Sequence, residues 1–176
     1  MVKEIARTVE IPEGVAVSVE GNTVTVKGPK GQLTRQLSYP EIEITKEDSQ
    51  LIVNSRLNRK QHRAMVGTLA AHVGNMIAGV TRGYEYKMKV VYSHFPIQLK
   101  AAPNELIINN FLGERKPRSA RILPGAKVEI GKDEVSITGI DKEQVGQTMA
   151  NIEQATKVRG FDIRIFQDGI YLVEKR

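Results

Sequence analysis

The sequence predicts an α+β protein made by tandem duplication, in which each copy is an antiparallel β-sheet packed on one α-helix. The first observation is that IPEGVAVSVEGNTVTVKG at 11–28 and ILPGAKVEIGKDEVSITG at 122–139 align without a gap. The second is that each segment precedes a stretch with the apolar spacing of an amphipathic helix, which then runs into a glycine and an aromatic residue. Because the order of the elements repeats along with the residues, we infer two copies of one unit.

Both aligned segments are predicted β-hairpins. Val15, Val17 and Val19 alternate with polar residues at the period of two that buries one face of a strand. Glycine and polar residues at 20–22, and again at 131–133, supply the predicted turns.

Further strands are predicted at different places in the two copies. In the first copy, 32–55 lies between hairpin and helix and is broken at Pro40. In the second copy, 83–93 and 104–111 precede the hairpin.

Helices are predicted where apolar residues recur every three or four positions, over 65–80 and over 145–152. Asp141 and Gln144 have the spacing of a capping box at the start of the second helix.

Gly83 and Gly160 follow these helices and are predicted to end them. The sequence therefore predicts an N-terminal copy at 1–82 and a C-terminal copy at 83–176.

The charge balance favours an anionic partner. The 176 residues include 26 Lys plus Arg against 20 Asp plus Glu, a net charge of +6, and the larger share of it falls in the C-terminal copy.

Several classes of site are excluded or disfavoured by the sequence. Cysteine is absent, which excludes disulfides, thiol nucleophiles and cysteine-ligated metals. The three histidines lack carboxylates at metal-ligand spacing, and the glycine-rich stretch 28–31 lacks the spacing of a phosphate-binding loop. We therefore predict no metal, no cofactor and no catalytic residue.

The sequence also favours a soluble intracellular protein without a membrane segment. Residues 1–10 lack the apolar core of a secretory signal. The uncharged stretch 64–80 is shorter than the roughly 20 apolar residues that a membrane span needs.

The most basic segment is a predicted loop at 113–121, within FLGERKPRSARIL. Pro117 keeps this segment extended. Arginine forks grip phosphate oxygens in pairs, so the sequence predicts a phosphate clamp here, with a solvated loop as the alternative. The four cations of the predicted clamp are Arg115, Lys116, Arg118 and Arg121.

Two further basic clusters are candidates for contacts, the first with RNA or protein and the second with RNA. The first cluster leads into the first helix, where cations oppose the helix dipole and cost a little stability. Either a binding partner favours these cations, or they form a charged lead-in with no partner. This first cluster consists of Arg56, Arg59, Lys60 and Arg63. The second lies toward the C-terminus and consists of Lys157, Arg159, Arg164, Lys175 and Arg176. Terminal Lys-Arg pairs are also common in frayed chain ends, so this cluster alone does not indicate a partner.

Aromatic residues are only 5% of the chain. This scarcity favours recognition of RNA backbone and shape over a groove that stacks a single strand.

At this point the sequence resembles a known family, the large-subunit ribosomal protein L-six family in its archaeal and eukaryotic branch, and within it an archaeal 50S subunit protein. The resemblance covers essentially the whole chain. Phe161 departs from it, because the branch has a lysine or arginine there. The most specific stretches are IPEGV at 11–15, VTVKGPKGQL at 24–33, RAMVGTLAAHVGNMIAGVTRGY at 63–84 and DIRIFQDGIYLVEKR at 162–176.

The resemblance implies a non-enzymatic structural constituent of the large ribosomal subunit in the cytoplasm. It implies binding to 23S-type rRNA near the sarcin-ricin loop, the stalk base and the translation-factor site, chiefly through the C-terminal copy. Implied partners are large-subunit rRNA, neighbouring ribosomal proteins including those of the stalk base and, indirectly, translation factors, with no membrane and no small-molecule substrate. The expected RNA-binding residues are Arg115, Lys116, Arg118, Arg121, Lys157, Arg159, Lys175 and Arg176.

Two other classes of function stay open on the residues alone. A protein-only adaptor would pair partners with exposed sheet edges. An enzyme acting on a phosphorylated metabolite would use the same basic loop, but it needs a general acid or base that the sequence does not assemble.

Overall fold

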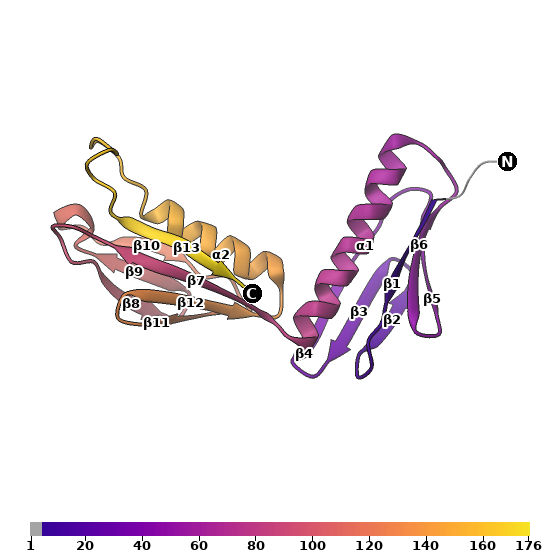
Figure 1. Ribbon diagram of the computed structural model, residues 1–176. Coiled ribbons are helices and arrows are strands. Elements are labelled where there is room, and N and C mark those ends of the chain that lie inside the picture. The colour runs from indigo at the N-terminus through magenta and orange to yellow at the C-terminus, as the bar shows by residue number, and fades with distance from the viewer. Residues whose placement is uncertain (1–4) are drawn as a thin grey trace. The chain divides into compact units, whose positions relative to one another are not determined.

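The computed structural model describes residues 5–176, which form two compact α+β units (Figure 1). The N-terminal unit ends at Gly83 and the C-terminal unit begins at Tyr84. Residues 1–4, which belong to the predicted N-terminal copy and to the stretch tested for a signal, lie outside the described residues.

The N-terminal unit has two three-stranded antiparallel sheets and one helix. The sheet orders are β1-β6-β5 and β2-β3-β4. The predicted hairpin is β2–β3, in which Val17 faces Val26 and Val19 faces Val24. The elements are β1 (Ile5–Glu10), β2 (Ala16–Glu20), β3 (Thr23–Gly28), β4 (Gly31–Gln36), β5 (Ile42–Glu47), β6 (Gln50–Ser55) and α1 (Lys60–Thr81).

Valines from strands and helix make the core of this unit. Val24 and Val26 of β3, Val53 of β6, and Val66 and Val73 of α1 are all fully buried. By length and composition alone α1 could cross a membrane. Its buried side nevertheless packs on β1, β3 and β6, so α1 is the core helix of a folded unit.

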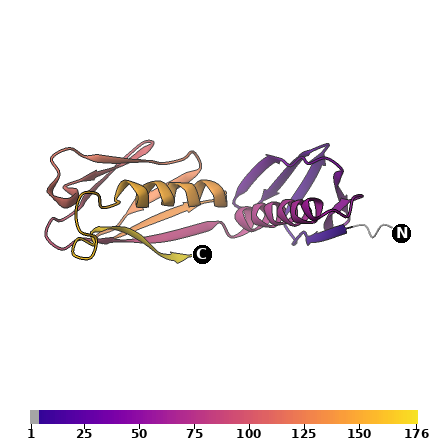
Figure 2. The same ribbon diagram turned by 90° about the horizontal axis from the view of Figure 1, so that it is seen from above.

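The C-terminal unit repeats this arrangement with different additional strands. Its sheets are β11-β12-β7-β13 and β10-β9-β8, and α2 packs on β10, β12 and β7 (Figure 2). The elements are β7 (Tyr84–Val91), β8 (Gln98–Ala102), β9 (Glu105–Asn109), a short 3₁₀ turn η1 (Phe111–Gly113), β10 (Arg118–Arg121), β11 (Ala126–Ile130), β12 (Glu134–Gly139), α2 (Lys142–Ala155) and β13 (Gly169–Lys175).

The predicted α+β class and the duplication are confirmed, with more detail than the sequence supplied. Hairpin and helix recur as β2–β3 with α1 and as β11–β12 with α2. The additional strands extend the hairpin sheet and build a second sheet in each unit. In the N-terminal unit β4 joins the hairpin sheet and β1, β5 and β6 form the second. In the C-terminal unit β7 and β13 join the hairpin sheet and β8 to β10 form the second.

The predicted basic loop is shorter than expected. β10 takes up residues 118–121, because Arg118 pairs with Ile108 and Ala120 with Leu106 of β9. The connection between η1 and β10 is therefore only 114–117.

One of the two predicted helix stops is wrong. Gly83 follows α1 with a φ of 76° and donates its N–H to the carbonyl of Ala78, as a helix-terminating glycine does. The second helix ends at Ala155, well before Gly160.

A threonine hydroxyl marks the end of α2 instead. Thr156 Oγ1 donates to the carbonyls of Ile152 and Glu153, both at 3.2 Å, and accepts the N–H of Ile170 at 3.1 Å. Satisfying the last carbonyls in this way makes a glycine cap unnecessary.

At its start, α2 is capped by the predicted Asp141. The Asp141 side chain accepts a hydrogen bond from the backbone N–H of Glu143, with Oδ1 2.9 Å from the nitrogen.

A glycine at the end of each hairpin lets the chain lie against its helix. A Cβ at Gly28 would lie 2.7 Å from Val80 Cγ2 and 2.9 Å from Val80 O. At Gly139 it would lie 2.7 Å from both Gly125 O and Val145 Cγ2. The two glycines align in the sequence repeat, so the same close approach is kept in both units.

We expect Gly28→Ala and Gly139→Ala each to destabilise the unit that contains it by about 1–3 kcal/mol, because the added methyl group meets backbone atoms that cannot move aside cheaply. Urea-induced unfolding followed by circular dichroism measures the change. The matched control is Gly67→Ala on α1, where an added Cβ meets nothing within 4 Å, and it should stabilise by up to about 1 kcal/mol. An equal change in the free energy of unfolding in all three variants would contradict the inference that Gly28 and Gly139 lack room for a side chain.

Candidate nucleic-acid interface

Arg118, one of the four predicted clamp cations, points into the unit. Its Nε donates to Glu114 Oε2 at 2.8 Å and its Nη2 to Glu114 Oε1 at 2.6 Å. Its Nη1 donates to the carbonyls of Ala155 at 2.9 Å and Lys157 at 3.0 Å. The guanidinium also lies over the ring of Phe111, 4.3 Å from its centroid. Arg118 thus joins the 114–117 turn to the end of α2.

The position of Arg118 suits a cation. The C-terminal carbonyls of a helix carry partial negative charge, and a guanidinium can cap them. Four of the five N–H donors of Arg118 are engaged within the protein. This arrangement argues against the predicted phosphate contact of Arg118 and makes it a positioning residue.

The same pair shifts the ionisation of Glu114. The hydrogen bonds from Arg118 lower the pKa of the Glu114 carboxyl from its ordinary value, with the positive charge of Arg118 adding to the effect against some desolvation. The carboxylate form therefore belongs to the folded structure.

The other cations of the predicted clamp are exposed but do not share one place. Arg115 and Lys116 lie on the 114–117 turn, ahead of Pro117. Arg121 lies at the end of β10 and lines a groove between that strand and α2.

The groove between β10 and α2, which we call the β10–α2 groove, brings Arg121 together with Arg159 from beyond the helix end. Three amide side chains of α2, Gln147, Asn151 and Gln154, lie between them along the groove wall. Asn151 Nδ2 donates to the carbonyl of Arg121 at 2.9 Å, and Gln147 Nε2 donates to Asn151 Oδ1 at 3.0 Å. The groove is thus a polar surface with Arg121 from the strand, Arg159 from beyond the helix end and a row of amides from α2.

The amide row was missed in the sequence, although a signal was present. Gln147, Asn151 and Gln154 recur at intervals of four and three residues, which places them on one face of a helix. Only the position of β10 alongside that face shows that they line a groove rather than a solvated surface.

The groove continues toward the Arg118 network. Glu114, Arg118, Gln154 and Arg159 line an adjoining hollow with Ser119 and Ala155. Arg159 and Gln154 border both hollows, so the network holds one end of the β10–α2 groove in place.

The remaining predicted residues of the C-terminal cluster are placed differently. Lys157 follows α2 and is exposed. Lys175 and Arg176 lie at the far end of β13 from this groove, where Lys175 Nζ is 5.5 Å from the centroid of the Tyr86 ring. Arg176 pairs with Glu174 at 2.6 Å.

The predicted cluster of the N-terminal unit surrounds the start of α1. Arg56 pairs with Glu43 at 2.9 Å. Arg59 is the N-cap residue, Lys60 and Arg63 lie in the first turn, and this described turn carries no acidic residue. No acidic side chain of this first turn therefore offsets the positive end of the α1 dipole.

Among residues 5–176, no three His, Cys, Asp or Glu side chains are grouped so that they could hold a metal ion.

Comparison with known proteins places these features in a family. The sequence model of the family described as Ribosomal protein L6 matches residues 11–83 and 95–169. The chain is similar to "Large ribosomal subunit protein uL6" of Methanothrix thermoacetophila, with 65% identity over 100% of both chains. It is 54% identical to the protein of the same name from Methanosarcina mazei over 99% of each chain. It is 56% identical to that from Methanospirillum hungatei over 97% of each.

We expect Arg118→Ala to destabilise the protein by about 1–3 kcal/mol, since it strips hydrogen bonds from Glu114 and from two carbonyls at the end of α2. Arg118→Lys should recover less than half of this loss, because an ammonium group cannot reproduce the planar fork. Urea unfolding measures both. Arg115→Ala, a change on the same turn, should stay within about 0.5 kcal/mol of the parent protein, and an equal loss at the two positions would refute the positioning role.

Stability should also depend on the ionisation of Glu114. The pKa of Glu114 is lowered in the folded state. Its contribution to the free energy of unfolding is therefore fully present above the unfolded pKa of about 4.3 and is lost as the pH falls through the lower folded pKa. We expect Glu114→Gln to be less stable than the parent at pH 7 and the difference to shrink below about pH 4. Urea unfolding at a series of pH values tests this, and a difference that stays constant from pH 7 to pH 3 would contradict it.

Proposed function

Because the chain belongs to the ribosomal protein L6 family, we propose that its C-terminal unit binds folded rRNA of the large ribosomal subunit along the β10–α2 groove. The chain is a structural protein of the large subunit rather than an enzyme, and it works on the cytoplasmic ribosome. The observation that carries the proposal is the meeting of Arg121 and Arg159 in one groove lined by amides.

The groove has the chemistry that RNA backbone requires. Arginine forks bind phosphate oxygens in pairs. Amide side chains such as Gln147 and Gln154, both exposed, bond sugars and phosphates and fix the register of a nucleic acid without reading its sequence. Recognition would therefore be of shape and backbone, which is the usual way in which proteins recognise double-stranded RNA.

Exposed cations extend this surface at the end of α2 that Arg118 joins to the 114–117 turn. Arg115 and Lys116 would contact phosphates beside the adjoining hollow, and Lys157 would do so beyond the helix end. Arg118 serves these contacts indirectly by holding the turn. Lys175 and Arg176 would meet RNA only at a separate place, at the end of β13.

The resemblance of the sequence to the archaeal and eukaryotic branch of the family supports a more precise place for the protein on the large subunit, close to the sarcin-ricin loop, the stalk base and the site of translation factors. In this proposal the N-terminal unit meets neighbouring ribosomal proteins of the stalk base through Arg59, Lys60 and Arg63. Translation factors would be affected only indirectly, through the rRNA. Cross-linking of assembled subunits from residues near the start of α1 tests this part, and a complete lack of cross-linked neighbours would refute it.

The salt dependence of RNA binding tests the groove. If about four phosphates are neutralised, log affinity for a large-subunit rRNA fragment should fall against log salt with a slope of about −3 to −4. The double variant Arg121→Gln with Arg159→Gln should bind more weakly, with a slope shallower by about 2.

The matched control removes two cations from the β11–β12 hairpin of the same unit, Lys127→Gln with Lys132→Gln, both of which are exposed. This control variant loses the same charge as the groove variant, and its log affinity should fall against log salt with nearly the slope of the parent protein. A groove variant that binds as the control does would assign the contact to another surface, whereas a flat salt dependence of the parent protein would refute RNA binding altogether.

A further inference from the structure

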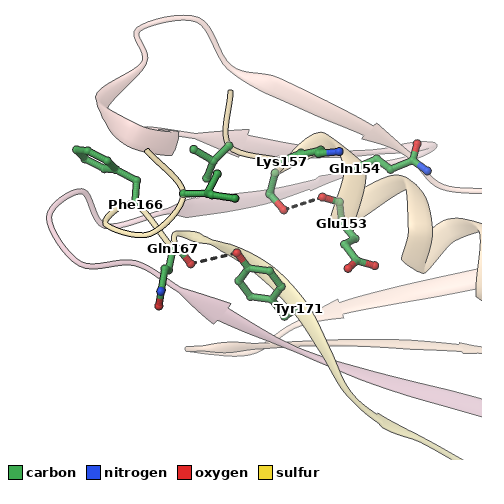
Figure 3. Close-up of a pocket in the computed structure, with 9 residues that line it drawn as sticks. Glu153, Gln154, Lys157, Phe166, Gln167 and Tyr171 are labelled. Atoms are coloured by element: carbon green, nitrogen blue, oxygen red, sulfur yellow. Dashed lines mark hydrogen bonds between the residues drawn. The ribbon is translucent and has the colours of Figure 1, made fainter. Parts of the chain in front are cut away.

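We propose that a separate hollow at the C-terminal end of α2 receives one unstacked nucleobase of the RNA that lies in the β10–α2 groove. This inference rests on the proposed function and assigns it a further binding site. The hollow lies between the end of α2 and the segment that leads into β13 (Figure 3). We call it the base hollow.

The base hollow has apolar walls with polar groups at its edge. Val158, Ile163 and the ring of Tyr171 supply apolar surface, and Gln154 and Gln167 supply amides. Its volume of about 460 Å³ falls in the range of about 300–1,000 Å³ that small-molecule sites occupy. A flat aromatic ligand with hydrogen-bonding edges matches such a lining, and a nucleobase is a ligand of that kind.

The walls are fixed before any ligand arrives. The hydroxyl of Tyr171 donates to the carbonyl of Gln167 at 3.1 Å, which holds the ring in place (Figure 3). Asp162 Oδ1 accepts the N–H of Arg164 at 2.9 Å, and the carbonyl of Asp162 accepts those of Ile165 and Phe166. A preorganised site loses less conformational entropy on binding than a loose one.

Aromatic and apolar groups gather here although the chain as a whole is poor in aromatic residues. The rings of Phe161 and Phe166 lie 4.8 Å apart. Phe161 is 47% exposed, Ile163 68% and Tyr171 42%. A cluster of exposed apolar side chains on one segment indicates a surface that a partner covers.

The charges around the base hollow favour RNA as that partner. Lys157 lines it, and Arg159 and Arg164 flank it on the same segment. The acidic groups nearby are Asp162, whose carboxylate is engaged in its own turn, Asp168, which is buried and accepts the N–H of Ser93 at 3.4 Å, and Glu153 at the rim. Phosphates on either side of an inserted base would lie among the three cations, while a carboxylate such as Glu153 can accept a base amino group.

The base hollow borders the proposed RNA path. Gln154 lines both the base hollow and the β10–α2 groove, and Arg159 of the groove lies two residues after Lys157 of the base hollow. An RNA backbone bound in the groove therefore passes close enough to turn one nucleotide into the base hollow.

The test compares two single variants on the full chain, Ile163→Ser and Ile165→Ser. Both side chains are highly exposed, 68% and 70%, so neither change should disturb folding, but only Ile163 lines the base hollow. Contacts of a base with apolar and aromatic side chains should make Ile163→Ser lower affinity for the large-subunit rRNA fragment by about fivefold or more. The salt slope should stay at the parent value, because no charge is removed. Ile165→Ser should bind as the parent does.

Chemical probing of the Watson–Crick edges of the same RNA fragment supplies a second readout. The parent protein and Ile165→Ser should protect one unpaired nucleotide that Ile163→Ser leaves reactive. Thermal melting of each variant confirms an intact fold.

Each other outcome overturns the inference in a recognisable way. Parent-like binding and protection by Ile163→Ser would refute the base hollow while leaving the groove in place. Equal losses in both variants would assign the effect to a general apolar contact. Capture of a ribosomal protein that needs Ile163 and survives nuclease treatment would assign the hollow to a protein segment. A parent protein without salt-dependent RNA binding would refute the proposed function itself.

Discussion

The guanidinium of Arg118 holds together the part of the C-terminal unit on which its functional surface depends. One side chain bridges a carboxylate on the 114–117 turn, two carbonyls at the end of α2 and the face of Phe111. A planar, permanently charged group with diverging donors can satisfy such a set of acceptors at once, and no other side chain has this shape. The base hollow lies at the end of α2 that Arg118 fixes, and one end of the β10–α2 groove lies there as well.

Duplication supplied two similar scaffolds, and small differences give the C-terminal one the groove in which we propose that RNA binds. In both units a hairpin lies against a helix through a glycine, Gly28 or Gly139, that leaves no room for a side chain. In the C-terminal unit β10 runs beside α2, and the strand and the polar helix face together form a groove. In the N-terminal unit α1 has 22 residues and packs on β1, β3 and β6, so the same elements serve chiefly to build a core.

Local patterns were enough to predict the repeating elements. The alternation of valines located β2 and β3, and the three- and four-residue spacing of apolar residues located α1 and α2, because these periods follow from backbone geometry alone. The family resemblance was likewise confirmed over the whole chain.

What sequence could not supply depends on contacts between distant residues. Four nearby cations looked equivalent, yet Arg118 is drawn inward by carbonyls about 37 residues away, which only the folded chain brings close. The stop of α2 at Thr156 depends in the same way on β13, whose Ile170 N–H bonds to the threonine hydroxyl. The meeting of Arg121 with Arg159, and the base hollow as a whole, required the same tertiary information.

The place of β13 in its sheet sets the order in which the protein can take shape during synthesis. All described strands of the N-terminal unit, and α1, precede residue 83, so this unit can close while the remainder of the chain is still being made. In the C-terminal unit, β7 pairs with both β12 and β13, and β13 (Gly169–Lys175) is made after every other described element of the unit. One side of β7 therefore stays unpaired until β13 has been made. Since the base hollow needs Tyr171 of β13, it forms later in synthesis than the β11–β12 hairpin and α2.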